Sequence, residues 1–203
     1  MPRYARIHVT GGLFHIISRF HDRRYYLDIE GAREKYLDLL GKAVETHDGR
    51  IIAYCLMSTH IHLVMQLGSD PIGLLARKVH GPFGAWINKK RGGLGTILAD
   101  RPKSVLVHSE MYGMELIRYV HNNPVRAGVV SRASESDWSS HCAYLGLNAC
   151  LPLDASLTEW INPISFSKKR HWNSKLTTSM CQNDESALKL TFRSQKKKIM
   201  GNF

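Results

Sequence analysis

His60 and His62 are the pair of residues in this sequence whose type and spacing could bind a metal ion. Residues 60–67 are predicted to form a β-strand, in which alternate side chains point to opposite faces. The two imidazoles then share a face, with Cα atoms roughly 6.5 Å apart at about 3.3 Å of rise per residue. Two nitrogen donors at this spacing can chelate one ion. His-x-His on a strand is equally compatible with no metal, and the absence of a nearby Cys or acidic partner disfavours zinc.

A tyrosine and an asparagine four residues apart could supply a third ligand and a reactive group. Residues 110–123 have apolar positions at helical spacing, so Tyr119 and Asn123 would lie on one helix face. Two imidazoles and one amide oxygen leave room for water and phosphate oxygens, which suits Mg²⁺ or Mn²⁺ better than structural zinc. Tyr119 could then be a nucleophile, although a phenol needs help from a polarised phosphate or a base. The alternative is an ordinary half-buried helix tyrosine.

The elements that would position these residues follow the order β-α-β-β-α-β-α. We predict strands at 13–20, 50–57, 60–67 and 104–108, and helices at 29–46, 71–90 and 110–123, with a kink at Gly81-Pro82. This order indicates an α+β sandwich with helices on a mainly antiparallel sheet. The two-residue break at Ser58-Thr59 permits a hairpin. Pro124 should end the last helix, because the residue before a proline is steered away from the α region.

The composition is that of a globular protein of 203 residues with 43% hydrophobic residues. No apolar run approaches the roughly 20 residues of a membrane span, and no signal peptide pattern is present. The four cysteines lack CxxC spacing, so we expect reduced thiols and a cytoplasmic location.

The net charge of +11 indicates a polyanionic partner, because each neutralised phosphate releases condensed counterions. Nucleic acid is the leading candidate and an anionic membrane surface is the second. Residues 1–150 hold 19 Lys or Arg against 13 Asp or Glu, and residues 151–203 hold 9 against 4. The basic character therefore belongs to the body of the chain as well as to its end.

Three motifs resemble those of the single-tyrosine transposases of the His-hydrophobic-His superfamily, and in particular the REP-associated tyrosine transposases. They are His60-Ile61-His62, the stretch Tyr-Val-His-Asn-Asn-Pro-Val-Arg-Ala-Gly at 119–128, and Trp138-Ser139-Ser140. The resemblance covers residues 1–146, which we expect to form the transposase domain. Residues 147–203 match no motif and are expected to be a basic C-terminal appendage.

The resemblance implies a ferredoxin-like βαββαβ fold with the tyrosine helix appended. It implies that His60, His62 and Asn123 hold Mg²⁺ or Mn²⁺ and that Tyr119 attacks a phosphodiester, leaving a 5′-phosphotyrosine bond and a free 3′-OH. The implied substrate is single-stranded DNA beside a hairpin of palindromic repeats, bound by a monomer or a homodimer. His121 should point elsewhere on the helix, so we do not expect it to be a ligand.

Eight basic residues could contact DNA phosphates, although each could equally be a solvated surface charge. They are Arg19, Arg23, Arg24, Arg77, Lys78, Lys89, Lys90 and Arg126. Two functions from different classes fit these observations: a strand-transferring endonuclease, or a nucleic-acid-binding regulator that keeps the fold without catalysis. Hairpin binding that persists in EDTA without any cut product would favour the regulator. A membrane-surface protein is a third, weaker alternative, because no strongly amphipathic basic helix is apparent.

Overall fold

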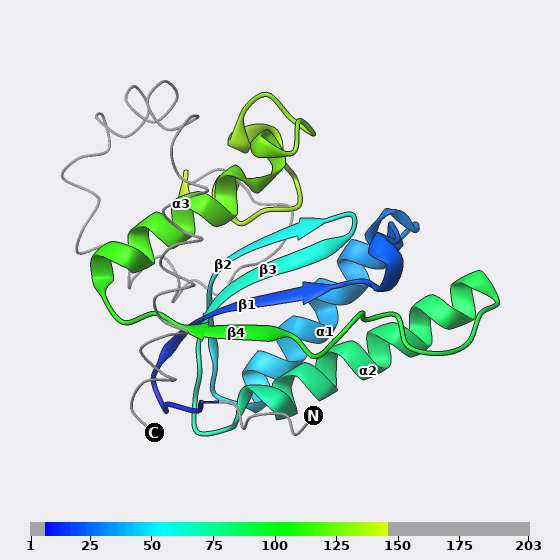
Figure 1. The fold of residues 1–203 in the computed structure, drawn as a ribbon, viewed down its shortest axis with the longest axis horizontal. Helices are drawn as coiled ribbons and strands as arrows, with labels where there is room; N and C mark the ends of the chain where they lie inside the picture. The colour runs from blue at the N-terminus through cyan, green and yellow to red at the C-terminus, as the bar shows by residue number, and fades with distance from the viewer. Residues whose placement is uncertain (1–6, 146–203) are drawn as a thin grey trace. The chain divides into compact units, whose positions relative to one another are not determined.

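A computed structural model describes residues 7–145, which fold around a four-stranded antiparallel sheet with the strand order β2-β3-β1-β4 (Figure 1). The strands are β1 (Leu13–Arg19), β2 (Arg50–Met57), β3 (His60–Gln66) and β4 (Lys103–Leu106). The α-helices are α1 (Ala32–Thr46), α2 (Ile72–Arg91), α3 (Glu110–Arg126) and α4 (His141–Tyr144). Short 3₁₀ helices are η1 (His21–Arg23), η2 (Tyr26–Asp28) and η3 (Ala133–Glu135). This order and topology confirm the predicted α+β, ferredoxin-like βαββαβ fold followed by the tyrosine helix.

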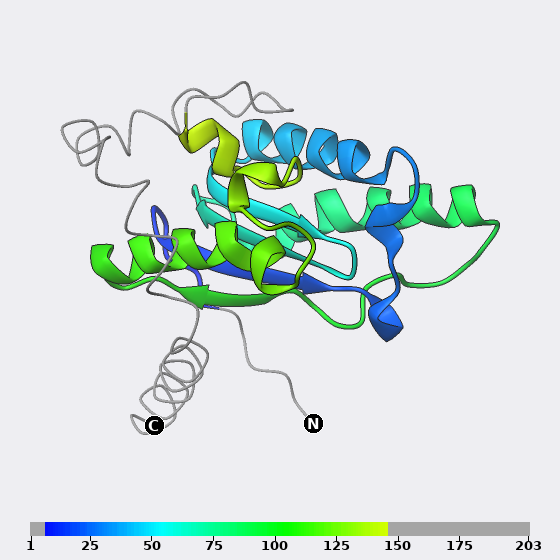
Figure 2. The ribbon, with the colours of Figure 1, turned by 90° about the horizontal axis from the view of Figure 1, so that it is seen from above.

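Helices α1 and α2 cover one face of the sheet, and α3 covers the other (Figure 2). The alternation of side chains along β3 explains both contacts. Ile61, Leu63 and Met65 belong to the larger apolar core, beneath α1 and α2. Val64 belongs to a second apolar cluster that is completed by α3, and His62 points to the same side. The sheet is therefore buried on both faces.

Strand β3 lies between β2 and β1, so its side chains are flanked on both sides. The predicted hairpin is confirmed: Met57 pairs with His60 across the two-residue turn. His62 is opposite Cys55 on β2 and opposite Ile17 on β1. This central position places His62 in the interior and leaves His60 at the end of its strand, where it is half-buried.

Helix α3 does not end before Pro124, and that prediction was wrong, because the helix continues to Arg126. Proline has no N–H, so it cannot donate the usual hydrogen bond to the carbonyl of Val120. The side chain of Asn123 compensates in part, since its Nδ2 lies 3.5 Å from that carbonyl and 2.8 Å from the carbonyl of Tyr119. A side-chain amide thus supports the turn that the proline weakens.

The actual end of α3 is a Schellman motif centred on Gly128, which has a left-handed φ of +68°. The Gly128 N–H donates to the carbonyl of Val125 at 3.0 Å, and the Val129 N–H donates to that of Pro124 at 2.9 Å. Glycine adopts this conformation without a steric penalty, so the final residue of the 119–128 motif has a structural role.

Helix α2 likewise runs without interruption from Ile72 to Arg91 through Pro82. Pro82 leaves the carbonyl of Lys78 without its helical donor, and Lys78 is exposed, so water can bind that carbonyl. No helix among residues 7–145 is both long enough and apolar enough to cross a membrane. The predicted domain boundary at residue 146 and the basic appendage at 147–203 lie outside the described residues.

The segment after α3 returns to the free edge of β2. Leu56 N–H donates to the carbonyl of Trp138 at 2.9 Å, and Ser140 N–H donates to that of Tyr54 at 3.0 Å. The Trp138-Ser139-Ser140 motif therefore covers an edge that would otherwise expose unpaired backbone groups.

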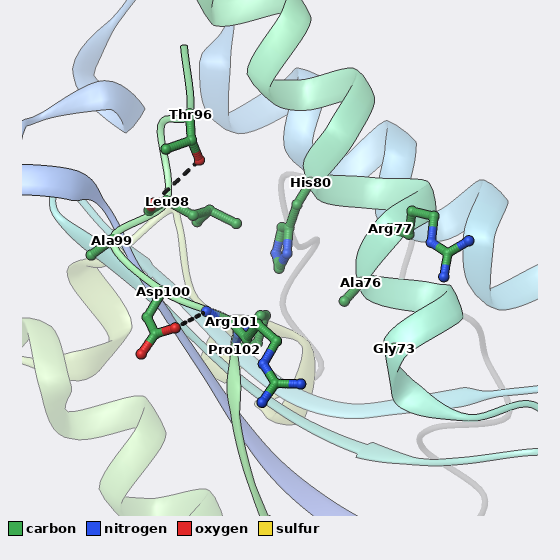
Figure 3. A pocket seen from close by; sticks show the side chains of 10 residues that line it. All are labelled: Gly73, Ala76, Arg77, His80, Thr96, Leu98, Ala99, Asp100, Arg101 and Pro102. Atoms are coloured by element: carbon green, nitrogen blue, oxygen red, sulfur yellow. Dashed lines mark hydrogen bonds between the residues drawn. The ribbon is translucent and has the colours of Figure 1, made fainter. Parts of the chain in front are cut away.

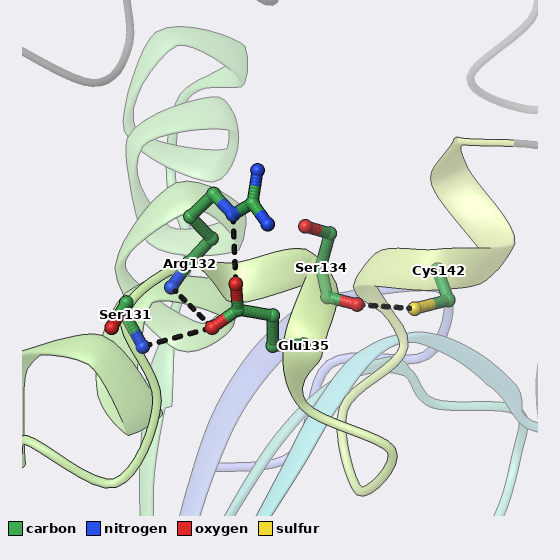
Figure 4. Close-up of polar contacts among 5 residues, drawn as sticks. All are labelled: Ser131, Arg132, Ser134, Glu135 and Cys142. Carbon is green, nitrogen blue, oxygen red and sulfur yellow. Dashed lines mark hydrogen bonds and ion pairs between the residues drawn. The ribbon is translucent and has the colours of Figure 1, made fainter.

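Four polar contacts hold this returning segment in shape (Figure 4). The Glu135 carboxylate accepts hydrogen bonds from the backbone of Ser131 and Arg132 at 3.0 and 3.1 Å, and it pairs with the Arg132 guanidinium. The Cys142 thiol donates to the carbonyl of Ser134 at 3.4 Å.

Candidate active site

His60 and His62 lie side by side on β3, with ring centroids 5.0 Å apart. The Nδ1 of His62 is 3.1 Å from Nε2 of His15, and the Nδ1 of His60 is 2.9 Å from the hydroxyl oxygen of Thr59. No described residue is hydrogen-bonded to the Nε2 of either ligand candidate. Both Nε2 atoms are therefore available to an ion.

Burial lowers the pKa of both imidazoles. The pKa of His62 falls well below 6.5, mainly through burial and further through the neighbouring His15, His60 and Arg19. The pKa of His60 is lowered by burial and then by Arg19. Both rings are therefore neutral at neutral pH, as coordination of a metal requires.

Helix α3 places Tyr119 against these rings. The apolar side chains of Leu116 and Val120 bury one side of the helix on the sheet. Tyr119 then meets His62 edge to face, with ring centroids 5.7 Å apart. The Arg126 guanidinium lies over the tyrosine ring, 5.3 Å from its centroid. No described residue is hydrogen-bonded to the Tyr119 hydroxyl, so this oxygen is available for chemistry.

Asn123 lies one turn after Tyr119, and its amide is held by the helix itself. Its Nδ2 donates to the carbonyl of Tyr119 at 2.8 Å, which fixes the orientation of the amide. No described residue bonds the amide oxygen, so Oδ1 remains available as a hard, neutral donor.

These donors fit a divalent ion that prefers oxygen and imidazole ligands. No group of three His, Cys, Asp or Glu within residues 7–145 is arranged to hold a metal ion. The candidate third protein ligand beside His60 and His62 is the amide oxygen of Asn123, on the helix that carries Tyr119. Two neutral nitrogens and one amide oxygen leave positions for water and phosphate oxygens, as Mg²⁺ and Mn²⁺ require.

A pocket of about 460 Å³ adjoins His60 and carries two of the predicted phosphate-binding arginines. Its lining is Arg19, Phe20, Asp22, Arg23, Thr59, His60 and Ala99. The Asp22 carboxylate, whose Oδ2 lies 2.9 Å from Nδ1 of His21, also lines the pocket, so two guanidinium groups and one carboxylate belong to its lining. Asp22 and Arg23 have left-handed φ values of +53° and +52°, and such strain is often kept at functional loops.

Arg77 is not part of this pocket. It lines a second pocket, of about 430 Å³, between α2 and the segment 96–102 (Figure 3). In that pocket the Nε2 of His80 lies 3.0 Å from the Tyr36 hydroxyl and 3.3 Å from that of Ser18. Tyr36 belongs to α1, so these contacts are on the face of the sheet opposite α3.

The other predicted basic residues are also away from Tyr119. Lys78 is exposed on α2, while Lys89 and Lys90 lie in its last turn, at the end that projects past the sheet (Figure 1). Lys90 lies over the Trp86 ring at 5.3 Å. Arg24 is exposed after η1 and does not line the pocket beside His60. The structure thus brings only Arg19, Arg23 and Arg126 to the imidazole and tyrosine group.

His121 is not directed to the candidate metal ligands, as expected. Its Nε2 is 2.7 Å from the Ser140 hydroxyl oxygen, and its ring meets that of Tyr144 edge to face. Burial lowers the pKa of His121 to about 3, with a further contribution from His141. His121 therefore ties α3 to the segment that covers the edge of β2.

His15 is the residue at this site that sequence reasoning missed. It is 1% exposed, and burial lowers its pKa to about 4. Because alternate residues of a strand point to the same face, His15 lies on the same face of β1 as Ile17, which is paired with His62. Only the pairing of β1 with β3 reveals the contact, because 46 residues separate the two histidines in sequence.

Comparisons with solved structures bear on the fold. The structure of a REP-associated tyrosine transposase bound to a REP hairpin matches with a TM-score of 0.63 and 20% sequence identity, over 76% of this chain and 90% of that one. The crystal structure of a candidate transposase from Deinococcus radiodurans R1 matches with a TM-score of 0.41 and 15% identity, over 60% of this chain and 97% of that one. No protein-family model and no curated protein matches the sequence. At 20% identity, the first likeness shows that the two chains share a fold.

Proposed function

We propose that this chain is a metal-dependent endonuclease and strand transferase of the REP-associated tyrosine transposase type, acting on single-stranded DNA. The observation that carries the proposal is the convergence of a tyrosine from α3 with two imidazoles from β3, 5.7 Å from Tyr119 to His62 between ring centroids. The open Nε2 atoms of His60 and His62 support a role as ligands.

His60, His62 and Asn123 would hold the ion. A bound Mg²⁺ or Mn²⁺ would polarise the scissile phosphate and stabilise the leaving 3′ oxygen. The protein itself would orient the donors: the hydrogen bonds of Thr59 and the helix backbone hold the side chains of His60 and Asn123.

Tyr119 would be the nucleophile. Its hydroxyl oxygen attacks phosphorus, an O–P bond to the tyrosine forms, and the bond between phosphorus and the 3′ oxygen breaks. The phenol proton passes to solvent, and the leaving oxygen takes up a proton to give a free 3′-OH. The new 5′-phosphotyrosine bond replaces the broken phosphodiester, so a second 3′-OH can reverse the step without ATP. The Arg126 guanidinium provides positive charge over the ring of the proposed nucleophile.

A DNA hairpin with a single-stranded flank is the proposed substrate. The solved relative of similar fold was bound to a REP hairpin. In this chain the pocket beside His60 carries Arg19 and Arg23, which suit a phosphate of the flanking strand.

The test is incubation of the full chain with end-labelled hairpin DNA carrying single-stranded flanks, in Mg²⁺, in Mn²⁺ and in EDTA. Denaturing gels should show a covalent protein–DNA adduct with either ion and none in EDTA. Tyr119→Phe should abolish the adduct while hairpin binding remains within a few-fold of the wild-type value, because only the attacking hydroxyl is removed.

Tyr112→Phe is the matched control, because Tyr112 is an α3 tyrosine whose ring stacks on that of His108, and the variant should still form the adduct. A Tyr119→Phe protein that cleaves would contradict the proposed nucleophile. Hairpin binding that is unchanged by EDTA, with no adduct for the wild-type chain, would instead favour a DNA-binding regulator.

A further inference from the structure

His60, His62 and Tyr119 are joined at the candidate site by a fourth aromatic ring, that of His15 from β1. Its ring stacks on that of His62, with centroids 5.3 Å apart and planes inclined by 19°. It also meets Tyr119 edge to face at 6.3 Å. His15 is 1% exposed and His62 is 4% exposed, so water does not compete for the hydrogen bond between them.

The location of His15 would suit an apolar residue. Side chains at positions 13, 15 and 17 face α3, and the other two are Leu13 and Ile17. A buried polar ring at such a place is retained at low cost only when it is hydrogen-bonded. The Nε2 of His15 is bonded to Nδ1 of His62 at 3.1 Å.

We propose that His15 is a positioning residue, which fixes the tautomer and the ring orientation of His62 and so directs Nε2 of His62 to the ion. This inference rests on the proposed function, because it concerns the same metal site. In a neutral imidazole one nitrogen carries the proton and the other has the lone pair. The Nδ1–H of His62 donates to the lone pair on Nε2 of His15, which leaves the lone pair of His62 on Nε2.

The first test reads the tautomer without metal or DNA. Histidine side-chain ¹⁵N–¹H correlation spectra of the full chain in EDTA should show His62 protonated on Nδ1. The same state should persist in His15→Gln, because the glutamine amide oxygen can accept the hydrogen bond. It should be lost in His15→Leu. A wild-type His62 protonated on Nε2, or the same tautomer in His15→Leu, overturns the proposal.

The second test measures Mn²⁺ affinity by calorimetry. His15→Leu should weaken binding about 10- to 100-fold, the usual cost of removing a partner of a metal ligand. His15→Gln should recover most of this loss. His80→Leu is the matched control: it removes another histidine hydrogen-bonded to two side chains, on the opposite face of the sheet, and should lower thermal stability without changing Mn²⁺ affinity.

Unchanged Mn²⁺ affinity in His15→Leu overturns the role of His15, even if the protein cleaves DNA. A loss of Mn²⁺ affinity in His15→Gln as large as that in His15→Leu also overturns this role. A wild-type chain that shows the expected tautomer and Mn²⁺ affinities but forms no adduct overturns the proposed function and leaves the assignment of His15 in place.

Discussion

His60, His62 and Asn123 each use one polar atom for a hydrogen bond within the protein and leave another available. The engaged atoms are Nδ1 of His60 on Thr59, Nδ1 of His62 on His15, and Nδ2 of Asn123 on the helix backbone. Bonds of this kind fix the direction of a ligand before the ion arrives, which reduces the entropy lost on binding. In the proposed site, this arrangement would allow two imidazoles from β3 and one amide from α3 to serve the same ion.

Asn123→Ala tests whether the amide oxygen is a ligand. We expect Mn²⁺ affinity to fall at least about tenfold, or about 1.4 kcal/mol, because the variant leaves only two protein donors. Asn123→Asp keeps an oxygen and should bind Mn²⁺ more tightly than Asn123→Ala, although both lose the hydrogen bond to the Tyr119 carbonyl. Calorimetry gives the affinities, and urea unfolding reports the cost to the fold. Equal affinities for the wild type and Asn123→Ala would remove Asn123 from the ligand set.

Acid should destabilise the fold through its buried histidines. Burial lowers the pKa of His15 to about 4 and that of His121 to about 3, whereas unfolding restores values near 6.5. Below pH 6.5 the unfolded chain therefore binds protons that the folded chain does not, so the free energy of unfolding decreases as the pH is lowered. His15 alone should lower the free energy of unfolding by up to about 3 kcal/mol as the pH falls from 6.5 to 4. Above pH 6.5 both states are neutral and the contribution vanishes.

Urea unfolding at a series of pH values checks this expectation. His121→Gln cannot titrate and retains a group able to bond Ser140, so its stability should fall less steeply between pH 6.5 and 4. Parallel curves for the wild type and His121→Gln would show that His121 is not kept neutral by the fold.

The residues of the candidate site differ in how far the sequence predicts them. The alternation of side chains along a strand predicts that His60 and His62 share a face, and helical spacing predicts the same for Tyr119 and Asn123. The same alternation assigns His15 to one face of its own strand. The neighbour of that strand depends on the order of strands in the sheet, which the spacing of residues along the chain does not give, so the contact with His62 could not be predicted.

At the scale of elements, the stretch 119–128 encodes both the turn that carries the proposed nucleophile and the end of a helix. The rule that a residue before proline avoids the helix failed here. The Asn123 side chain lies within hydrogen-bond distance of the Val120 carbonyl, which Pro124 leaves without its usual donor, and also bonds the Tyr119 carbonyl. Such compensation depends on a side-chain rotamer and is not visible in the spacing of residues. Gly128, by contrast, is the residue type that a left-handed helix end favours.

Gly128→Ala tests how far the end of α3 supports the site. An alanine at φ +68° should cost about 1 kcal/mol of stability. Because the last two turns of the helix carry Tyr119 and Asn123, adduct formation should fall as well. Gly92→Ala is matched to it: Gly92 ends α2 at φ +64°, and at both glycines an added Cβ would meet no atom within 4 Å. It should lose similar stability in urea and keep wild-type adduct yields. Equal yields from both variants would show that the end of α3 does not position the site.

At the scale of the whole molecule, the net charge of +11 predicts a polyanionic partner but not where it binds. The fold separates the candidate contacts. Arg19, Arg23 and Arg126 lie beside the imidazole and tyrosine group, while Arg77 lines a pocket against α2. This division follows from sheet order and helix orientation, so composition and charge spacing along the chain could not predict it.

The double variant Arg19→Ala/Arg23→Ala should weaken hairpin binding and reduce its dependence on salt. Each phosphate contact contributes about 0.7 to 0.9 to the slope of log K against log salt, through the counterions released. Removing two contacts should therefore lower the magnitude of the slope by about 1.5.

The comparison is Lys35→Ala/Lys42→Ala, which removes the same charge from α1, on the face of the sheet opposite α3. If charge acts only through the field of the whole protein, both pairs should change the slope alike. If the pocket beside His60 holds phosphates, fluorescence anisotropy titrations from 50 to about 300 mM salt should separate the two variants, with the α1 pair keeping the wild-type slope.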